Sequence, residues 1–160
     1  MIKLGDKLPD IGFKILGANG VEAISFADIF ANKKVVVFSL PGAFTPTCSA
    51  KHLPGFVENS TAIKSKGVDT IACVAVNDAF VMDAWGRDQN VGDKVLMLAD
   101  GSAVWSDEIG LGVDLSAAGM GKRGKRFVMI IDDGIVSHLA VEEKGAFEVS
   151  SAEAILKILG

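Results

Sequence analysis

Among the side chains able to do chemistry, Cys48 has the most distinctive setting. It ends the segment PGAFTPTC (residues 41–48), which follows an apolar run (residues 34–40) and precedes a helix-like stretch. A thiol at a helix start meets unpaired backbone N–H groups and the positive end of the helix dipole, and both favour the thiolate. The thiolate is a nucleophile, whereas an ordinary buried cysteine is an inert small hydrophobe. Which kind Cys48 is decides the function.

The residue three positions before Cys48 limits the type of thiol chemistry. A dithiol shuttle carries Cys-x-x-Cys, but here that position is Thr45, so a dithiol mechanism is not expected. Pro41 and Pro46 stiffen the loop. Thr45 can cap the helix, act as a hydroxyl partner of the thiol, or do both.

Composition narrows the class of protein. The chain has 160 residues, 49% hydrophobic and 22% charged, which predicts one compact domain over residues 1–160. A net charge of −4 argues against nucleic-acid binding, and most of the basic run 122–126 is expected in a solvated loop. No secretory leader and no apolar run of about 20 residues is seen, so membrane insertion is not expected. With only two cysteines, the sequence predicts a reducing compartment, most simply the cytoplasm.

The elements that must position Cys48 follow from hydrophobic patterning. We predict a hairpin region and then a helical turn at 25–30, and a buried strand at 35–40. A helix is expected from about Thr47 to Lys66, ending at Gly67. Pro54 should kink or break that helix near His52.

The second half predicts two more strands, a hairpin and a closing helix. Strands are expected at 70–76 and 95–98, with Asn77 capping a helix between them. Asp132-Asp133-Gly134 is a hairpin signal between strands 126–131 and 135–141. A capping box at 150–153 opens a helix at 154–159. This order indicates an α/β, thioredoxin-like fold, with a central mixed sheet flanked by helices.

The segment 41–48 resembles the peroxiredoxin signature Pro-x-x-x-Thr/Ser-x-x-Cys, in the form of the type II, or peroxiredoxin-five, subfamily. The resemblance continues through HLPGF (52–56), VNDAFV (76–81) with Trp85-Gly86, and KRF (125–127). It covers nearly the whole chain. It implies an antioxidant enzyme, a thiol peroxidase that reduces hydrogen peroxide or alkyl hydroperoxides without a metal or organic cofactor.

The resemblance also implies roles for individual residues. Cys48 matches the peroxidatic cysteine, Thr45 its hydroxyl partner, and Arg126 the arginine that activates thiolate and peroxide. Pro41 matches the proline that shields the substrate pocket, with Gly42 beside it. The family further implies a homodimer packed through the active-site loops and the 80–85 helix; the residues expected at its interface are Phe44, Phe80 and Trp85.

Physical chemistry indicates where the rate acceleration must arise. A free thiol with a pKa of about 8.5 is only ~3% thiolate at neutral pH, so full ionisation gains at most ~30-fold, or about 2 kcal/mol. The larger share must come from donors preorganised around the O–O bond. We expect Thr45 Oγ, the amides at the helix start and Arg126 to supply them; the fork of Arg126 can bridge two acceptors.

Cys73 leaves the resolving step open. It lies in an apolar strand, where a buried, unreactive thiol is favoured. Type II relatives often carry a cysteine at this position, and some resolve their sulfenic acid with a cysteine near the C-terminus. Here residues 145–151 contain none. The resemblance then implies a one-cysteine cycle with glutathione, glutaredoxin or thioredoxin as reductant, since use of Cys73 would require the strand to open.

Other interpretations remain open at this stage. Cys48 alone could support thiol–disulfide exchange, or act as a non-enzymatic peroxide sensor or a dimeric binding module. Arg126 could be a surface cation, and Phe80 and Trp85 could be ordinary core on a helix face shared with Val81 and Ala84. His52 is expected to be a surface or packing residue, because one Cys/His pair makes no zinc site; His138 is expected to be structural.

Overall fold

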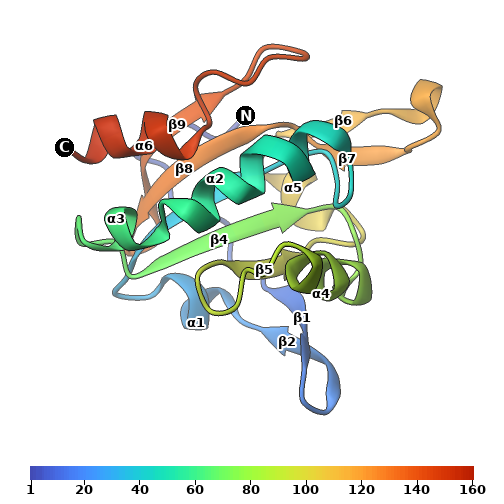
Figure 1. Ribbon diagram of the computed structural model, residues 1–160, viewed down its shortest axis with the longest axis horizontal. Helices are drawn as coiled ribbons and strands as arrows, with labels where there is room; N and C mark the ends of the chain where they lie inside the picture. Colours follow the sequence, from blue (N-terminus) through green and yellow to red (C-terminus); the bar gives the residue numbers. More distant parts are fainter.

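The computed structural model describes residues 1–160 as one mixed sheet covered on both faces (Figure 1). The seven strands of the sheet lie in the order β2-β1-β5-β4-β3-β8-β9. Strands β3, β4 and β5 run parallel, while β8 and β1 pair antiparallel with β3 and β5. This central mixed sheet flanked by helices confirms the predicted α/β, thioredoxin-like architecture.

The bounds of the elements are as follows. The strands are β1 (Phe13–Gly17), β2 (Gly20–Ile24), β3 (Lys34–Ser39), β4 (Thr70–Ala75), β5 (Leu96–Ala99), β6 (Gly112–Asp114), β7 (Lys122–Gly124), β8 (Phe127–Asp132) and β9 (Ile135–Val141). The α-helices are α1 (Phe26–Phe30), α2 (Leu53–Glu58), α3 (Ser60–Lys64), α4 (Ala79–Asp88), α5 (Val104–Glu108) and α6 (Ala152–Leu159). A π-helical turn, η1 (Cys48–His52), and a 3-10 turn, η2 (Ser116–Ala118), complete the set. None of the helices is both long and apolar enough to span a bilayer.

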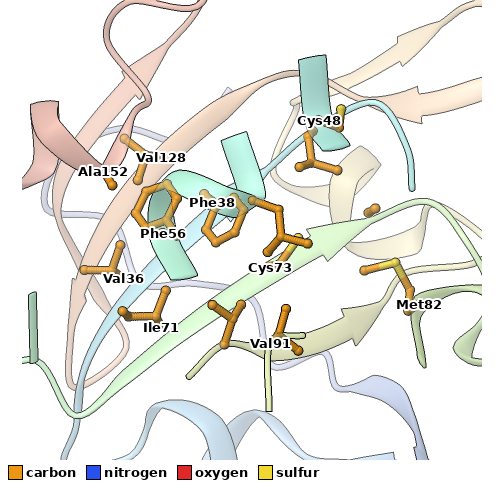
Figure 2. Packing of buried hydrophobic residues seen from close by; sticks show 14 of the residues in the cluster. Val36, Phe38, Cys48, Phe56, Ile71, Cys73, Met82, Val91, Val128 and Ala152 are labelled. Atoms are coloured by element: carbon orange, nitrogen blue, oxygen red, sulfur yellow. The ribbon is translucent and has the colours of Figure 1, made fainter. Parts of the chain in front are cut away.

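Alternation along the central strands places side chains in two cores. Val36 and Phe38 of β3 pack with Ile71 and Cys73 of β4 under helices α2, α3, α4 and α6. Figure 2 shows this cluster, with Cys48 and Cys73 in it on different elements. Val35 and Val37 face the opposite side, in a second cluster that includes residues of α1 and α5. Because β3 is buried on both faces, it fixes the loop that follows it.

The helix predicted from Thr47 to Lys66 is present but divided. Cys48–His52 forms a π-helical turn in which the Leu53 amide donates to the Cys48 carbonyl. Pro54 follows in the first turn of α2; because proline has no N–H, it cannot continue an α-helical ladder back into η1. The chain therefore changes helix type near His52, and the actual interruption lies at Asn59, between α2 and α3.

Two predicted helix caps are wrong by one residue. Asp78, not Asn77, caps α4 and accepts from the Val81 amide. Ser151, not Ser150, caps α6 through the Ala154 amide, so the expected capping box does not form. The residue that was predicted to cap makes a tertiary hydrogen bond instead. Asn77 Oδ1 accepts from the Ala43 amide, and the Ser150 hydroxyl donates to the Glu142 carboxylate.

The basic run 122–126 is also more ordered than predicted. Residues 122–124 form β7, which pairs with β6 in a separate two-stranded sheet. This ribbon projects beside the main sheet in Figure 1. Lys122 and Lys125 are exposed as expected, whereas Arg123 and Arg126 are half-buried and turn toward the Cys48 loop.

Candidate active site

Cys48 lies in the first turn of the helical segment, which starts at Pro46 after the loop that leaves β3, and its side chain is fully buried. The loop is held by its own hydrogen bonds and by the neighbouring strand end. The Thr45 hydroxyl donates to the Gly42 carbonyl at 2.7 Å, and the Ala43 amide donates to Asn77 Oδ1 at 2.9 Å. Asn77 follows β4, the parallel neighbour of β3, so the two loops emerge at the same sheet edge.

Arg126 is brought to Cys48 by strand pairing. Phe127, the first residue of β8, pairs with Ser39, the last residue of β3, so the residue just before β8 lies beside the loop of Cys48. Arg126 Nη2 donates to Cys48 Sγ at 3.2 Å. The contact places a permanently charged guanidinium against the sulfur. The structure thus joins two residues that are 78 positions apart.

His52 takes part in this arrangement, which the sequence did not predict. It is fully buried and is therefore not a surface residue. Its Nδ1 contacts Arg126 Nη1 at 2.7 Å, and its Nε2 contacts the Ser150 carbonyl at 2.9 Å. Burial, reinforced by the positive charge of Arg126, lowers the pKa of His52 to about 3. The ring is therefore neutral at physiological pH.

The two contacts of His52 determine its tautomer. A carbonyl oxygen and a guanidinium N–H can only accept and donate, respectively. Nε2 therefore carries the proton and donates to Ser150, while Nδ1 accepts from Arg126. Only its place in segment 52–56 could have drawn attention to His52, because its partners lie 74 and 98 residues away.

Thr45 has a more specific orientation than the sequence predicted. Because its hydroxyl proton is donated to the Gly42 carbonyl, its oxygen is left with lone pairs free to accept. In this orientation Thr45 Oγ can accept a hydrogen bond, whereas a donor was expected. No side-chain cap from Thr47 precedes η1.

Pro41 and Gly42 lie next to Arg123, which was predicted only as part of a solvated basic run. Arg123 Nε donates to the Met120 carbonyl at 2.9 Å, and its Nη1 donates to the Pro41 carbonyl at 3.3 Å. A Cβ on Gly42 would come within 2.6 Å of this Nη1. The absence of a side chain at Gly42 lets Arg123 approach the loop.

Cys73 lies in β4, fully buried in the same core cluster as Cys48, and the two thiols are not joined by a disulfide. Burial raises the pKa of the Cys73 thiol well above its ordinary value, and the nearby Cys48 raises it further. Cys73 is consequently held as a protonated thiol, which is a poor nucleophile.

The three aromatic residues expected at a dimer interface differ in exposure. Phe44, in a left-handed conformation (φ 62°), is 54% exposed, and Phe80 is 62% exposed. Trp85 is fully buried and donates from Nε1 to Ser49 Oγ at 3.0 Å, so it offers no surface to a partner and its predicted interface role is wrong. The shared face predicted for Phe80 and Trp85 is also wrong, because residues five apart lie about 140° apart around a helix.

Metal-ligating side chains do not cluster in this fold. No group of three or more His, Cys, Asp or Glu side chains is arranged to hold a metal ion. His138 is half-buried in β9, and this burial lowers its pKa.

Comparison with known proteins identifies the family. The Redoxin family matches residues 3–156. "Peroxiredoxin-2E, chloroplastic" from Arabidopsis thaliana is 46% identical over 162 residues, which cover 99% of this chain and 69% of that protein. The crystal structure of reduced Prx3 in complex with hydrogen peroxide from Vibrio vulnificus is 49% identical, with a TM-score of 0.96 and full coverage of both chains.

A more distant solved structure has the same fold. The Plasmodium falciparum antioxidant protein (1-Cys peroxiredoxin) is 30% identical with a TM-score of 0.90, over 99% of this chain and 98% of that one. Peroxiredoxins need no prosthetic group and draw electrons from thiol reductants. This membership favours peroxide reduction over the alternatives of disulfide exchange and non-enzymatic sensing. From the sequence signature, the fold and these relatives together, the chain belongs to the peroxiredoxins, the thiol-dependent peroxidases of the thioredoxin superfamily.

Proposed function

We propose that Cys48 is the residue oxidised by peroxide, and the observation that carries this assignment is the 3.2 Å contact between Arg126 Nη2 and Cys48 Sγ. The thiolate sulfur attacks the terminal oxygen of the hydroperoxide. A sulfur–oxygen bond forms, the O–O bond breaks, and the leaving oxygen takes a proton to depart as water or an alcohol. Cys48 is thereby oxidised by two electrons to a sulfenic acid.

Arg126 and Thr45 act on different atoms of the peroxide. The guanidinium carries further N–H groups beyond those used on Cys48 and His52, and these can stabilise the negative charge that builds on the leaving oxygen. Thr45 Oγ accepts the O–H of the attacked oxygen, because its own proton is engaged by Gly42. Pro41 and Gly42 form the loop wall that excludes water, held by Arg123.

The proposed catalytic cycle uses one cysteine. Cys73 is protonated and inside a central strand, so it cannot reach a Cys48 sulfenic acid without opening β4. An external thiol condenses with the sulfenic acid to give a mixed disulfide and water, and a second thiol releases Cys48. Glutathione with glutaredoxin, or thioredoxin, fits this chemistry. The similarity to the Plasmodium falciparum antioxidant protein, a 1-Cys peroxiredoxin, supports such a cycle.

The assembly we propose is a homodimer of single-domain chains, working in the cytoplasm. Exposed Phe44 lies in the active-site loop, while exposed Phe80 and Val104 line a surface hollow of about 700 Å³. Aromatic side chains such as Phe44 and Phe80 are enriched at protein interfaces. Two free cysteines suit a reducing compartment. Light scattering of wild type and Phe80→Glu tests the dimer, which the variant should weaken.

The test of the catalytic assignment compares the two cysteines. Cys48→Ser should abolish peroxide consumption with either glutathione and glutaredoxin or thioredoxin as reductant. Cys73→Ser is the matched control and should keep most of it. Substantial turnover by Cys48→Ser would overturn the assignment, and loss of turnover in Cys73→Ser would overturn the one-cysteine cycle.

A further inference from the structure

One carboxylate oxygen behind the site gathers an unusual number of hydrogen bonds. Glu142 Oε2 accepts from the amides of Glu148, Val149 and Ser150 at 2.8, 2.9 and 2.8 Å. It also accepts from the Ser150 hydroxyl at 2.6 Å. No ion pair involves Glu142, so its charge is balanced by these donors alone. Successive amides around one anion form a strong local clamp.

The clamped segment supplies two groups to the site. The Ser150 carbonyl accepts from His52 Nε2. The Phe147 ring lies 5.0 Å from the His52 ring and 5.8 Å from the Arg126 guanidinium carbon, measured to ring centroids. Glu142 lies directly across the strand pair from Arg126, and its amide donates to the Arg126 carbonyl at 3.0 Å. The clamp therefore lies immediately behind the catalytic arginine.

A continuous chain of contacts runs from this carboxylate to the sulfur. Glu142 holds Ser150, Ser150 holds the N–H side of His52, and the bare Nδ1 of His52 faces Arg126. If the Ser150 carbonyl moved away, the His52 proton could shift to Nδ1, which would then repel the Arg126 N–H group instead of accepting from it. The aim of the guanidinium thus depends on a segment that does not touch Cys48.

We infer that Glu142 is a positioning residue of this peroxidase, acting through Ser150 and His52 to hold Arg126 on the Cys48 sulfur. The inference rests on the proposed roles of Cys48 and Arg126. Groups held one contact away from reacting atoms alter rates strongly, because displacement of about 1 Å costs on the order of 100-fold. We expect a smaller, about tenfold, loss here, because Arg126 remains present and its range of orientations widens.

The kinetic experiment measures the rate of Cys48 oxidation by hydrogen peroxide in single turnover. Glu142→Ala should be about tenfold slower than wild type. Glu143→Ala, which removes a charge from the exposed neighbouring residue, is the matched control and should oxidise at the wild-type rate. If Glu142→Ala folds poorly, Glu142→Gln decides, with an expected slowing of about threefold. A rate within 1.5-fold of the Glu143→Ala control in a folded variant would overturn the inference.

A double-mutant cycle separates positioning from general structural damage. With His52→Phe the chain of contacts is already broken, so adding Glu142→Ala should change the oxidation rate by less than twofold. An equal tenfold effect of Glu142→Ala in both backgrounds would mean that Glu142 does not act through His52.

A spectroscopic measurement on the reduced protein needs no turnover. Nitrogen-15 NMR should show wild-type His52 as a single neutral tautomer protonated on Nε2, and Glu142→Ala should populate the Nδ1–H form. An unchanged His52 spectrum in Glu142→Ala would overturn the inference even if the cysteine assignment holds. Conversely, peroxide turnover by Cys48→Ser would contradict the proposed function. It would not contradict the role of Glu142 as long as His52 of the otherwise unchanged protein is protonated on Nε2 alone.

Discussion

At the scale of the residue, the proposed mechanism assigns more of the rate acceleration at Cys48 to the Arg126 guanidinium than to ionisation of the thiol. Full ionisation of an ordinary thiol gains only ~30-fold at neutral pH. Arg126 Nη2 donates to the sulfur and Nη1 to His52, and in the proposed reaction the remaining N–H groups stabilise the negative charge that develops during O–O cleavage. His52 stays neutral beside this cation, so it adds no charge that would repel it.

Replacement of Arg126 tests its contribution to the rate of Cys48 oxidation. Arg126→Ala should slow Cys48 oxidation by a few hundred-fold, if the arginine supplies about 3 kcal/mol of transition-state stabilisation. Arg126→Lys should recover only part of the rate, because a lysine cannot bridge two acceptors in a plane. Stopped-flow oxidation measures both, with the exposed Arg87→Ala as control. A decrease of less than about threefold in the oxidation rate of Arg126→Ala would contradict this role and favour the interpretation of Arg126 as a surface cation.

Sequence spacing could predict part of the site. Thr45 and Cys48 lie one turn apart on a recognisable segment, so local pattern suffices for them. Arg126 was predicted only from the family resemblance, because its proximity to Cys48 depends on how β8 pairs with β3. His52 was dismissed because a histidine's role depends on its partners, and both partners are distant in sequence.

At the scale of the element, the segment after β9 contributes contacts to the candidate site, as does the helical segment that contains Cys48. A turn closed by the Ala146 amide and the Glu143 carbonyl reverses the chain, with Gly145 at φ 79°. This reversal returns residues 148–150 to the Glu142 carboxylate. A residue with a Cβ disfavours this left-handed conformation, which makes Gly145 the sensitive position of the turn.

Gly145→Ala should therefore lower the free energy of unfolding by about 1 kcal/mol and also slow Cys48 oxidation severalfold. Gly67→Ala is a matched control: Gly67 has φ 90°, also has open space around it, and ends the helical region on the way to β4. It should cost similar stability, measured by urea unfolding, without altering the oxidation rate. Equal oxidation rates for the two variants would contradict a role for the turn in the site.

The elements themselves were largely predictable, and their ends were not. The apolar run of β3 correctly predicted a buried strand, and Asp132–Gly134 correctly predicted the hairpin between β8 and β9. Both predictions hold because hydrophobic pattern and turn chemistry are local. The cap errors at Asn77 and Ser150 have one cause: two adjacent polar residues can each cap a helix, and tertiary contacts decide which one is free to do so. The β6–β7 ribbon escaped prediction because its short strands carry mostly charged and glycine residues.

At the scale of the whole molecule, a neutral buried histidine makes stability depend on pH. The folded chain holds the pKa of His52 at about 3, whereas the unfolded chain titrates near the ordinary value of 6.5. Below pH 6.5 only the unfolded form takes up this proton, so the free energy of unfolding falls as the pH falls toward 3. From pH 7 to pH 5 the expected decrease from His52 is about 2 kcal/mol.

Urea unfolding at pH 7 and pH 5, at one protein concentration, measures this decrease. His52→Gln should remove most of the pH dependence, whereas His138→Gln should retain most of it, because His138 is only half-buried. The pKa of Glu142 is lowered in the folded chain, so protonation of this residue decreases the free energy of unfolding only below its ordinary pKa of 4.5, outside the range from pH 7 to pH 5. Equal stability of the wild type at the two pH values would contradict the neutral, buried state of His52.

The central claim for the whole molecule is that peroxide oxidises Cys48 and that an external thiol completes the cycle. Its most direct test is the intact mass of the reduced protein after one equivalent of hydrogen peroxide, with Cys48→Ser as control. The geometry predicts a species one oxygen heavier, absent in the control. A monomeric species two hydrogens lighter would instead show a Cys48–Cys73 disulfide and contradict the one-cysteine cycle. Absence of any rapid mass change would contradict the assignment of Cys48 itself.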